Sequence, residues 1–260
     1  MRVILLTGDG CEHRYVARRL REAVSDLEVV IETREGLPAS GIRSKLKRWM
    51  RRGPACVVDK ALRELFRRMI RDGARRESDL RGVLGDRFDL ERPVEQAHFV
   101  GSVNDPDAVD FVSEGSAGLV LVYGTGLVRK ATLDAIGAPV LNLHTGLSPY
   151  YRGVACHFWP LIDGRPDRVG VTAHECVPEL DAGRIFGTRV VPPVPGDTVH
   201  AVFARQVVAG AELYADIVRQ SMSGLPEGTS QDLSLGREYR GVELGLLAEI
   251  RARAAVRRFG

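Results

Sequence analysis

The sequence predicts an α/β protein with an open, mostly parallel, doubly wound sheet and a short helical C-terminal tail. Apolar runs typical of buried strands alternate with stretches whose apolar residues have helical spacing. Such alternation requires crossover connections, which pair strands in parallel. The first apolar run, Val3 to Thr7, leads into a glycine loop and then into a helical stretch, Arg14 to Ala23, as at the start of a doubly wound sheet.

The remaining elements follow from the same patterns. Strands are expected at Glu28 to Glu32, His98 to Val103, Gly118 to Tyr123, Val140 to His144, Gly170 to Glu175 and Ile185 to Val191. Helices are expected at Pro106 to Glu114, Arg129 to Ile136, Ala155 to Asp163 and Thr198 to Ser223. The stretch Ile42 to Arg81 is also helix-prone, and Gly53-Pro54 should divide it into two helices because proline breaks an α-helix.

The 260 residues fit one main domain with a tail. We expect a catalytic domain over residues 1–223, with a basic helical insertion at about 41–81, and a tail over 224–260 whose segment Val242 to Phe259 has helical spacing. The composition favours a well-filled core. No apolar run approaches the roughly 18 residues of a membrane span and no signal peptide is evident, so a cytoplasmic protein without a membrane partner is expected.

Neither a disulfide framework nor a metal site is expected. The cysteines are scattered, without a C-x-x-C pair: Cys11, Cys56, Cys156 and Cys176. Three histidines, His144, His157 and His174, fall close to two of these cysteines, but their spacing matches no common ligand pattern. The cysteines are therefore interpreted as free thiols.

Positive charge is concentrated in one segment. Between Gly41 and Glu77 there are thirteen Lys or Arg residues against four Asp or Glu, whereas the whole chain carries a net charge of +3. This segment is interpreted first as a solvated helical hairpin packed on the sheet, second as a site for a phosphorylated ligand, and third as a nucleic-acid patch. The first interpretation depends on a stripe of apolar residues that should be buried. Its members are Trp49, Leu62, Leu65, Phe66, Met69 and Ile70.

The strand that ends at His144 carries two polar residues that could act together. Side chains alternate along a strand, so Asn142 and His144 share one face at the carboxyl end, where open α/β sheets bind ligands. An amide donor beside a histidine suits the stabilisation of an oxyanion. The alternative is structural, with Asn142 capping a turn and His144 satisfied at the strand end.

A second polar position lies on a tight turn further along the chain. Asp181 begins the sequence Asp181-Ala182-Gly183 between two expected strands. From there it could abut His144, orient the imidazole and accept a proton. The alternative is an ordinary turn aspartate that accepts hydrogen bonds from local backbone amides.

Together these segments resemble the folate-dependent formyltransferase family, which includes glycinamide ribonucleotide, methionyl-tRNA and nucleotide-sugar N-formyltransferases. The family has a strand-borne Asn-x-His, a proline-containing loop that ends in Arg-Gly, and a downstream Asp-x-Gly-x-Ile. The corresponding residues here are Asn142 to His144, Pro149 to Gly153 and Asp181 to Ile185. The resemblance is clear over Gly118 to Val191 and implies a Rossmann-like fold.

The resemblance also implies a reaction and its co-substrate, 10-formyltetrahydrofolate. Asn142 and His144 would stabilise the tetrahedral oxyanion formed when an amine attacks the formyl carbon, and Asp181 would take up and return the amine proton. The stretch Tyr123, Gly124, Gly126, Leu127 and Val128 matches the family's glycine loop beside the folate pocket. A G-x-G pair alone is a weak dinucleotide signal, so no nicotinamide cofactor is inferred.

The acceptor is expected to be an amine on a small molecule, with an amino sugar on a nucleotide as the leading case. The N-terminal loop lacks the Gly-Ser-Asn of the purine enzymes, and the tail is too short for the β-barrel of the tRNA enzymes. Candidate acceptor-binding residues are Glu12, His13, Arg14 and Arg152. The first three could instead form an ordinary solvated helix start.

Three alternative functions stay open. The protein could be a 10-formyltetrahydrofolate deformylase, a methionyl-tRNA formyltransferase-like enzyme, or a folate-binding module without catalysis. Intact Asn142, His144 and Asp181 argue against the last of these. Nucleic acid is not expected as a partner, and the protein could form a homodimer.

Overall fold

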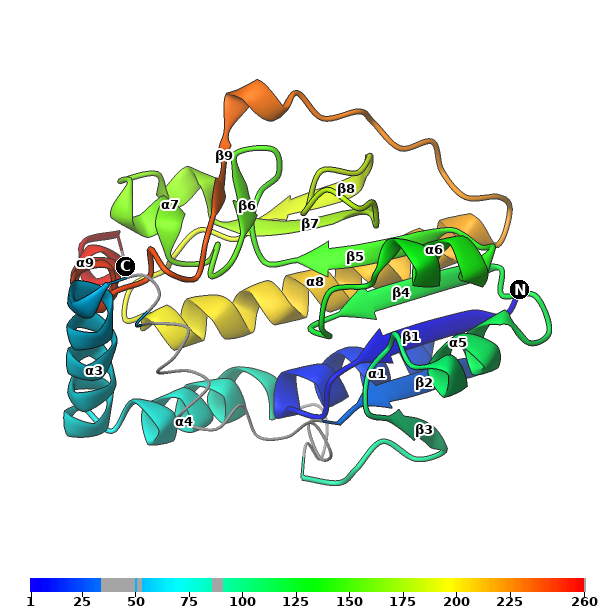
Figure 1. Cartoon of the computed structure of the whole chain (residues 1–260), viewed down its shortest axis with the longest axis horizontal. Coiled ribbons are helices and arrows are strands. Elements are labelled where there is room, and N and C mark those ends of the chain that lie inside the picture. The colour runs from blue at the N-terminus through cyan, green and yellow to red at the C-terminus, as the bar shows by residue number, and fades with distance from the viewer. Residues whose placement is uncertain (34–49, 51–52, 86–90, 260) are drawn as a thin grey trace.

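The computed structural model describes residues 1–33, 50, 53–85 and 91–259. Within these ranges the main sheet has seven strands in the order β3-β2-β1-β4-β5-β7-β8, which confirms the predicted α/β class (Figure 1). Their bounds are β1 Val3–Thr7, β2 Leu27–Glu32, β3 Ala97–Val100, β4 Leu119–Tyr123, β5 Val140–His144, β7 Gly170–Glu175 and β8 Ile185–Val190. The first five are mutually parallel, and β7 and β8 are antiparallel to their neighbours.

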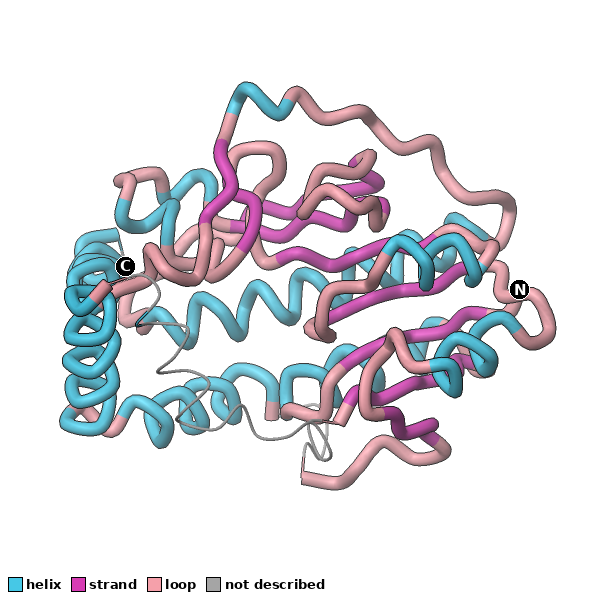
Figure 2. The backbone as a smooth tube through the Cα atoms, in the orientation of Figure 1, coloured by secondary structure: helices cyan, strands magenta, loops and turns pink. Residues whose placement is uncertain are grey.

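Helices cover both faces of the sheet, as the tube in Figure 2 shows. Alternate strand residues such as Leu5 and Leu121 pack on α1, α4 and α8, while their neighbours Leu6 and Val120 pack on α5 and α6. The bounds are α1 Cys11–Ala23, α4 Asp72–Leu84, α5 Pro106–Ser113, α6 Lys130–Ile136 and α8 Val199–Ser221. Because both of their faces are buried, the central strands β1 and β4 are apolar along almost their whole length rather than alternating.

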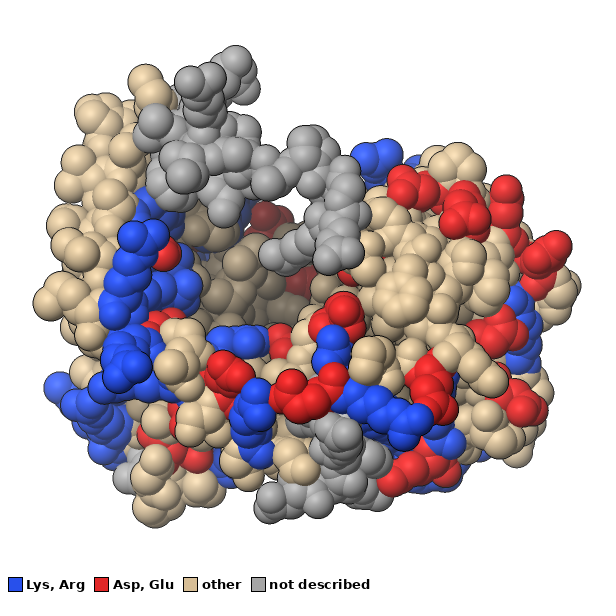
Figure 3. Space-filling model, turned by 90° about the horizontal axis from the view of Figure 1, so that it is seen from below, with Lys and Arg blue, Asp and Glu red and all other residues tan. Residues whose placement is uncertain are grey.

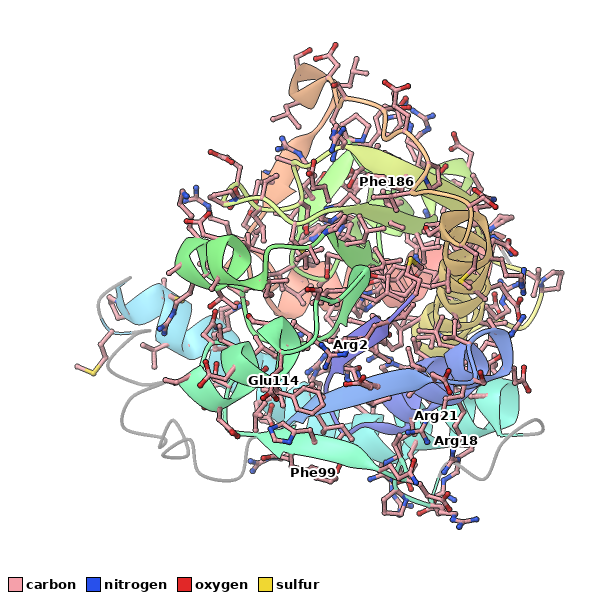
Figure 4. The ribbon with its side chains drawn as sticks, turned by 90° about the vertical axis from the view of Figure 1, so that its right-hand side faces the viewer. Arg2, Arg18, Arg21, Phe99, Glu114 and Phe186 are labelled. Carbon is pink, nitrogen blue, oxygen red and sulfur yellow. The ribbon has the colours of Figure 1, made fainter. Side chains whose placement is uncertain are left out.

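The amino ends of the strands are tied together at the edge that Figure 4 shows. The guanidinium of Arg2 donates to both carboxylate oxygens of Glu28, at 2.8 and 2.7 Å, and to the carbonyls of Phe111 and Glu114. Such a bidentate pair has well-defined geometry. This edge is closed by structural contacts, so the opposite edge is left for function.

The basic segment differs in part from the prediction. Residues 34–49 and 51–52, which contain most of the first predicted helix, lie outside the described residues. The second predicted helix is two helices, α3 Pro54–Met69 and α4, separated at Arg71, whose φ of +52° is left-handed. A backbone turn, not a proline or glycine, makes this second break, so composition did not reveal it.

The predicted buried stripe on α3 is wrong for three of its six residues. Leu62, Leu65 and Met69 are 47, 55 and 74% exposed, whereas Phe66 and Ile70 are half-buried and Trp49 lies outside the described residues. The polar side of the helix faces the protein instead, where Lys60 donates a 2.6 Å hydrogen bond to the carbonyl of Leu244. An amphipathic pattern shows that a helix has two faces, but the partner decides which face is covered.

The C-terminal tail returns to the main body along two elements. Strand β9, Arg237–Tyr239, pairs in parallel with β6, Tyr151–Gly153, so part of the stretch predicted as a loop is a strand. Helix α9, Leu246–Phe259, then packs on α3 and on α7, Trp159–Ile162. Helix α7 is shorter than the predicted Ala155 to Asp163, since Ala155 has a left-handed φ of +59°.

Helix α9 is fixed to α3 by a buried carboxylate. Glu249 is fully buried and accepts hydrogen bonds from Arg63 at 2.6 Å, Arg67 at 3.0 Å and Arg253 at 2.8 Å. These bonds hold the pKa of Glu249 below its ordinary value, although burial alone would raise it.

None of the helices in the described ranges combines the length and apolarity that crossing a membrane requires. Two 3-10 turns, Pro166–Arg168 and Leu233–Leu235, complete the described structure.

Candidate active site

The site begins at the carboxyl end of β5, in the interior of the sheet. Strand β5 lies between parallel β4 and antiparallel β7, so Asn142 and His144 are flanked on both sides. His144 is buried and Asn142 is half-buried. The sheet therefore brings both predicted residues to the edge where ligands reach an open α/β sheet.

A third residue joins them across the antiparallel pairing. In the register of β5 and β7, Asn142 lies opposite His174, and the amide Nδ2 is 3.2 Å from the imidazole Nε2. The Nδ1 atom of His174 lies 2.9 Å from the carbonyl of Glu175, so the imidazole has a polar partner at each ring nitrogen. Sequence reasoning did not place His174 in the site.

Asp181 completes the cluster from the turn between β7 and β8. Its Oδ2 lies 3.3 Å from Nδ1 of His144, and its Oδ1 lies 3.2 Å from Nε2 of His174. The backbone N–H of Gly153 donates to Oδ2 at 2.7 Å. The left-handed φ of +51° at Asp181 is a conformation that aspartate tolerates better than most residues. The turn thus aims one carboxylate at two imidazoles.

The electrostatics of the cluster favour an ionised carboxylate. Burial would raise the pKa of Asp181, but the nearby His144, the hydrogen bond to His174 and the Gly153 N–H outweigh it and lower the pKa to about 2. Burial also lowers the pKa of His144, against the opposing effect of Asp181. At neutral pH the site therefore holds an anionic Asp181 ready to accept a proton.

His144 has contacts at both ring nitrogens. Its Nε2 lies 2.9 Å from the carbonyl of Tyr151, and its Nδ1 faces Asp181. Here the imidazole positions the carboxylate and the loop that follows β5. The oxyanion role of His144 stays a prediction, and it requires one of these contacts to be exchanged for substrate, as catalytic hydrogen bonds often tighten only in the complex.

The loop after β5 is held close to this cluster. The hydroxyl of Thr172 donates to the carbonyl of Gly146 at 2.8 Å and accepts from the backbone N–H of Ser148 at 3.0 Å. A side chain at Gly146 would overlap the imidazole of His144. Glycine is therefore required where the backbone passes over the histidine.

A small apolar cavity opens beside Asn142 and Asp181. Its volume is about 130 Å³, and it is lined by the glycine loop after β4, including Gly126, Leu127 and Val128. The loop is anchored by Glu32, which accepts from the N–H of Gly126 at 2.6 Å. An apolar cleft that ends in an amide and a carboxylate suits a flat ring whose reactive carbonyl reaches the polar end. The volume accommodates only part of a folate.

Two residues of the predicted folate loop serve the fold. The ring of Tyr123 is buried and lies 5.0 Å from that of His13. Gly124 has a left-handed φ of +70°, and a side chain there would overlap His13. Both residues lie at the end of β4 against His13 of α1, and neither lines the cavity that contains Gly126.

The predicted acceptor residues have protein partners. His13 is 3.1 Å from the hydroxyl of Thr7, Glu12 pairs with Arg76 of α4, and Arg14 pairs with Asp9 at 3.0 Å. These three lie at the carboxyl end of β1, close to α4. Arg152 lies on β6, where its guanidinium is 3.4 Å from the carbonyl of Leu233 in the tail. A role for these residues in acceptor binding remains a prediction.

Comparison with known proteins places this site in a family. Residues 94–218 match the family model described as formyl transferase, and this range contains Asn142, His144, His174 and Asp181. The segment formed by residues 94–218 belongs to the formyl transferase family. The formyl transferase domain thus includes all the members of the cluster and the cavity-lining part of the glycine loop.

Three relatives illustrate the similarity. The methionyl-tRNA formyltransferase of Streptococcus pneumoniae is 30% identical over 129 residues, which is 50% of this chain and 41% of that enzyme. A sugar N-formyltransferase from a Shewanella species shares the fold with a TM-score of 0.59 at 16% identity, over 98% of this chain and 88% of that one. The N-formyltransferase of Helicobacter canadensis, solved with folinic acid and dTDP-3-aminofucose, has a TM-score of 0.59 at 11% identity, over 99% and 81%.

The formyl transferase domain contains no evident metal site in its described part. Across the described ranges, no group of three or more His, Cys, Asp and Glu side chains is arranged to hold an ion.

The sequence signal that could have identified His174 as a site residue is its position in the strand. His174 is the fifth residue of β7, and it lies opposite Asn142 once β7 is paired with β5 in antiparallel register.

Proposed function

We propose that this protein transfers a formyl group from 10-formyltetrahydrofolate to an amine on a small molecule. The observation that carries the proposal is the convergence of Asn142, His174, His144 and Asp181 beside the glycine-loop cavity, within residues that belong to the formyl transferase family. The chain spans about 41% of the length of the curated relatives that it matches. The activity of the whole protein is therefore a proposal, and it is based on this site.

The geometry supports a sequence of proton and group transfers. The amine attacks the formyl carbon, and the carbonyl oxygen becomes an oxyanion that the amide of Asn142 stabilises. The ionised Asp181 accepts the proton released by the amine. The tetrahedral intermediate then collapses, the bond from carbon to the folate nitrogen breaks, and the proton passes to that nitrogen. His144 and His174 hold the carboxylate in place through the 3.3 and 3.2 Å contacts.

We further propose that the acceptor is an amino sugar linked to a nucleotide. Structures of the same fold come from sugar N-formyltransferases, and one of them binds dTDP-3-aminofucose. The cationic residues of α3 and α4, several of which line a cavity near the site, suit a phosphorylated small molecule.

The test follows the absorbance change as 10-formyltetrahydrofolate is converted to tetrahydrofolate. The protein is assayed without an acceptor and then with a panel of amines that includes nucleotide-linked amino sugars. Turnover that depends on one of these sugars supports the proposal. Turnover that proceeds equally without any amine overturns it in favour of a deformylase, and folate binding without turnover on the whole panel overturns it in favour of a binding module.

A second candidate is formylation of methionyl-tRNA. It is favoured by one observation, the 30% identity to methionyl-tRNA formyltransferases over half of this chain. Filter binding with initiator tRNA separates the two candidates. Tight, salt-sensitive association together with formylation of the charged tRNA would favour the tRNA substrate over the amino sugar.

A further inference from the structure

A second cavity lies where α3 meets α4, outside the residues that have been assigned to the reaction. Its volume is about 540 Å³, within the range of small-molecule sites. Basic side chains from both helices line it together with aromatic residues from the body of the protein. Its lining includes Arg67, Arg68, Arg71, Arg76, His157 and Phe203. Figure 3 shows Lys and Arg side chains gathered beside a hollow in the face seen from below.

The carboxylates of this cavity are already compensated, so its surplus charge is positive. Glu64 pairs with Arg68 at 3.4 Å, and Asp72 lies 2.7 Å from His200 and 3.5 Å from Arg67. Arg71 has no side-chain hydrogen bond or ion pair within the described part of the chain. A guanidinium without a partner beside a cavity is suited to a phosphate.

The start of α4 adds to the attraction for an anion. Gly73 and Ala74 of its first turn line the cavity, and no side chain caps this helix end. The free N–H groups and the positive end of the helix dipole favour an anion there. Burial lowers the pKa of His157 to about 3, so this lining imidazole is neutral at neutral pH and adds no positive charge.

The cavity adjoins the reaction centre through one short stretch of chain. Gly153 donates its N–H to Asp181, and two residues later Ala155 lines the cavity. Arg76, which also lines the cavity, pairs with Glu12 at the first turn of α1. A ligand held by the arginines would therefore have the carboxyl edge of the sheet beside it.

We propose that this arginine-lined cavity binds the phosphate groups of the acceptor and thereby directs its amine towards Asp181. The inference rests on the proposed formyl transfer and adds to it the place where the acceptor is anchored. The cavity volume of about 540 Å³ suits a nucleoside diphosphate, and the lining ring of Phe203 adds an apolar surface beside the arginines. An extended RNA backbone would need an open charged face instead.

The test measures binding separately from turnover. Isothermal titration calorimetry with UDP, dTDP and inorganic pyrophosphate is performed on the full chain and on Arg71→Gln and Arg68→Gln. Each variant should weaken diphosphate binding about threefold to fivefold, because both arginines are exposed and solvent screens their attraction for a phosphate. The matched control is Arg81→Gln, because Arg81 lies on α4 outside the cavity and pairs with Glu77 at 2.7 Å. Its affinity should be unchanged.

Three results on diphosphate binding overturn the proposal. They are the absence of binding by the parent protein, an unchanged affinity in the Arg68→Gln/Arg71→Gln double variant, and equal weakening by Arg81→Gln. Two results on other substrates also overturn it. Binding of initiator tRNA in preference to diphosphates, lost in the same double variant, would overturn it in favour of RNA. Amine-dependent turnover with a KM unaffected by the double variant removes this anion site and leaves the formyl transfer standing. Diphosphate binding that depends on these arginines, in a protein that shows no turnover, would support the anion site and overturn the proposed formyl transfer.

Discussion

The Nδ1 atom of His144 lies 3.3 Å from Oδ2 of Asp181, a contact between the end of β5 and the turn that joins β7 to β8. Both side chains are buried, and the other carboxylate oxygen contacts His174. The low pKa of Asp181 follows from this arrangement, because protonating the carboxylate would remove its attraction to the imidazoles and its acceptance of the Gly153 N–H.

Replacing Asp181 by Asn should abolish most of the turnover while the fold is retained. The amide keeps an oxygen that can accept from the Gly153 N–H, but it cannot take a proton from the amine. A positioned general base contributes roughly 10²–10⁴ in rate, so kcat should fall by about that factor. Steady-state kinetics measures the loss, and thermal unfolding checks that the variant is folded. A kcat within a few-fold of the parent would remove Asp181 from the proton transfer.

Asp181 should also make stability depend on acidic pH. Its pKa is about 2 in the folded protein, against an ordinary value of 3.8, so its contribution is fully present above about pH 4 and is lost as the pH falls through 2. The difference corresponds to roughly 2 kcal/mol. Urea titrations at pH 5 and pH 2 should show the parent losing about that much more unfolding free energy than Asp181→Asn. Equal losses would mean that the carboxylate is not stabilised in the fold.

Replacing Asn142 by Ala should lower turnover by about 10²–10³, the effect of removing one oxyanion donor. The side chain is half-buried and its amide Nδ2 lies 3.2 Å from Nε2 of His174, so stability should change little. Single-turnover measurements at saturating folate separate the chemical step from binding. The assignment fails if the rate of that step stays near that of the parent, or if the loss is explained by unfolding.

Gly124→Ala should destabilise the protein more than Gly137→Ala does. Both glycines have a left-handed φ, +70° and +65°, so both substitutions carry the same backbone penalty of about 1 kcal/mol. Only at Gly124 would the new methyl overlap the imidazole of His13, since nothing lies within 4 Å at Gly137. Chemical denaturation of the pair isolates the steric contribution. Equal destabilisation would show that the imidazole moves aside without cost.

Leu65→Gln should leave the unfolding free energy within about 0.5 kcal/mol of the parent, because this leucine of α3 is 55% exposed. Leu80→Ala on α4 is the contrasting change. Its side chain is fully buried in the main core, so truncation should cost about 2–5 kcal/mol. Guanidinium titrations compare the two. A large loss for Leu65→Gln would restore the interpretation of α3 as a helix packed through its apolar stripe.

Much of the sheet could be predicted because its signals are local. The runs Val3–Thr7 and Val140–His144 are rich in Val, Ile and Leu and are followed by turn residues, so each strand could be identified without its neighbours. The order of motifs around Asn142 and Asp181 was equally readable, which is why the family was identified from a single stretch of chain.

The rest depends on contacts between distant segments. The direction of β7 relative to β5 decides that His174 faces Asn142, and no local pattern carries that direction. The same limit applied to α3, whose apolar residues are exposed because Lys60 and Arg63 on its other side find oxygen partners in the tail. Favourable pairing of buried charges overrode the usual preference for burying leucine.

Glu249 links the tail to α3 through three arginines, and one of them, Arg67, also lines the cavity between α3 and α4. The outer wall of that cavity is therefore built from segments that are separate from the seven-stranded sheet among the described residues. Substitutions in this wall leave the ends of β5 and β7 in place. The proposed anion cavity and the proposed reaction centre thus occupy different parts of the architecture, so we expect the one to tolerate change while the other is kept.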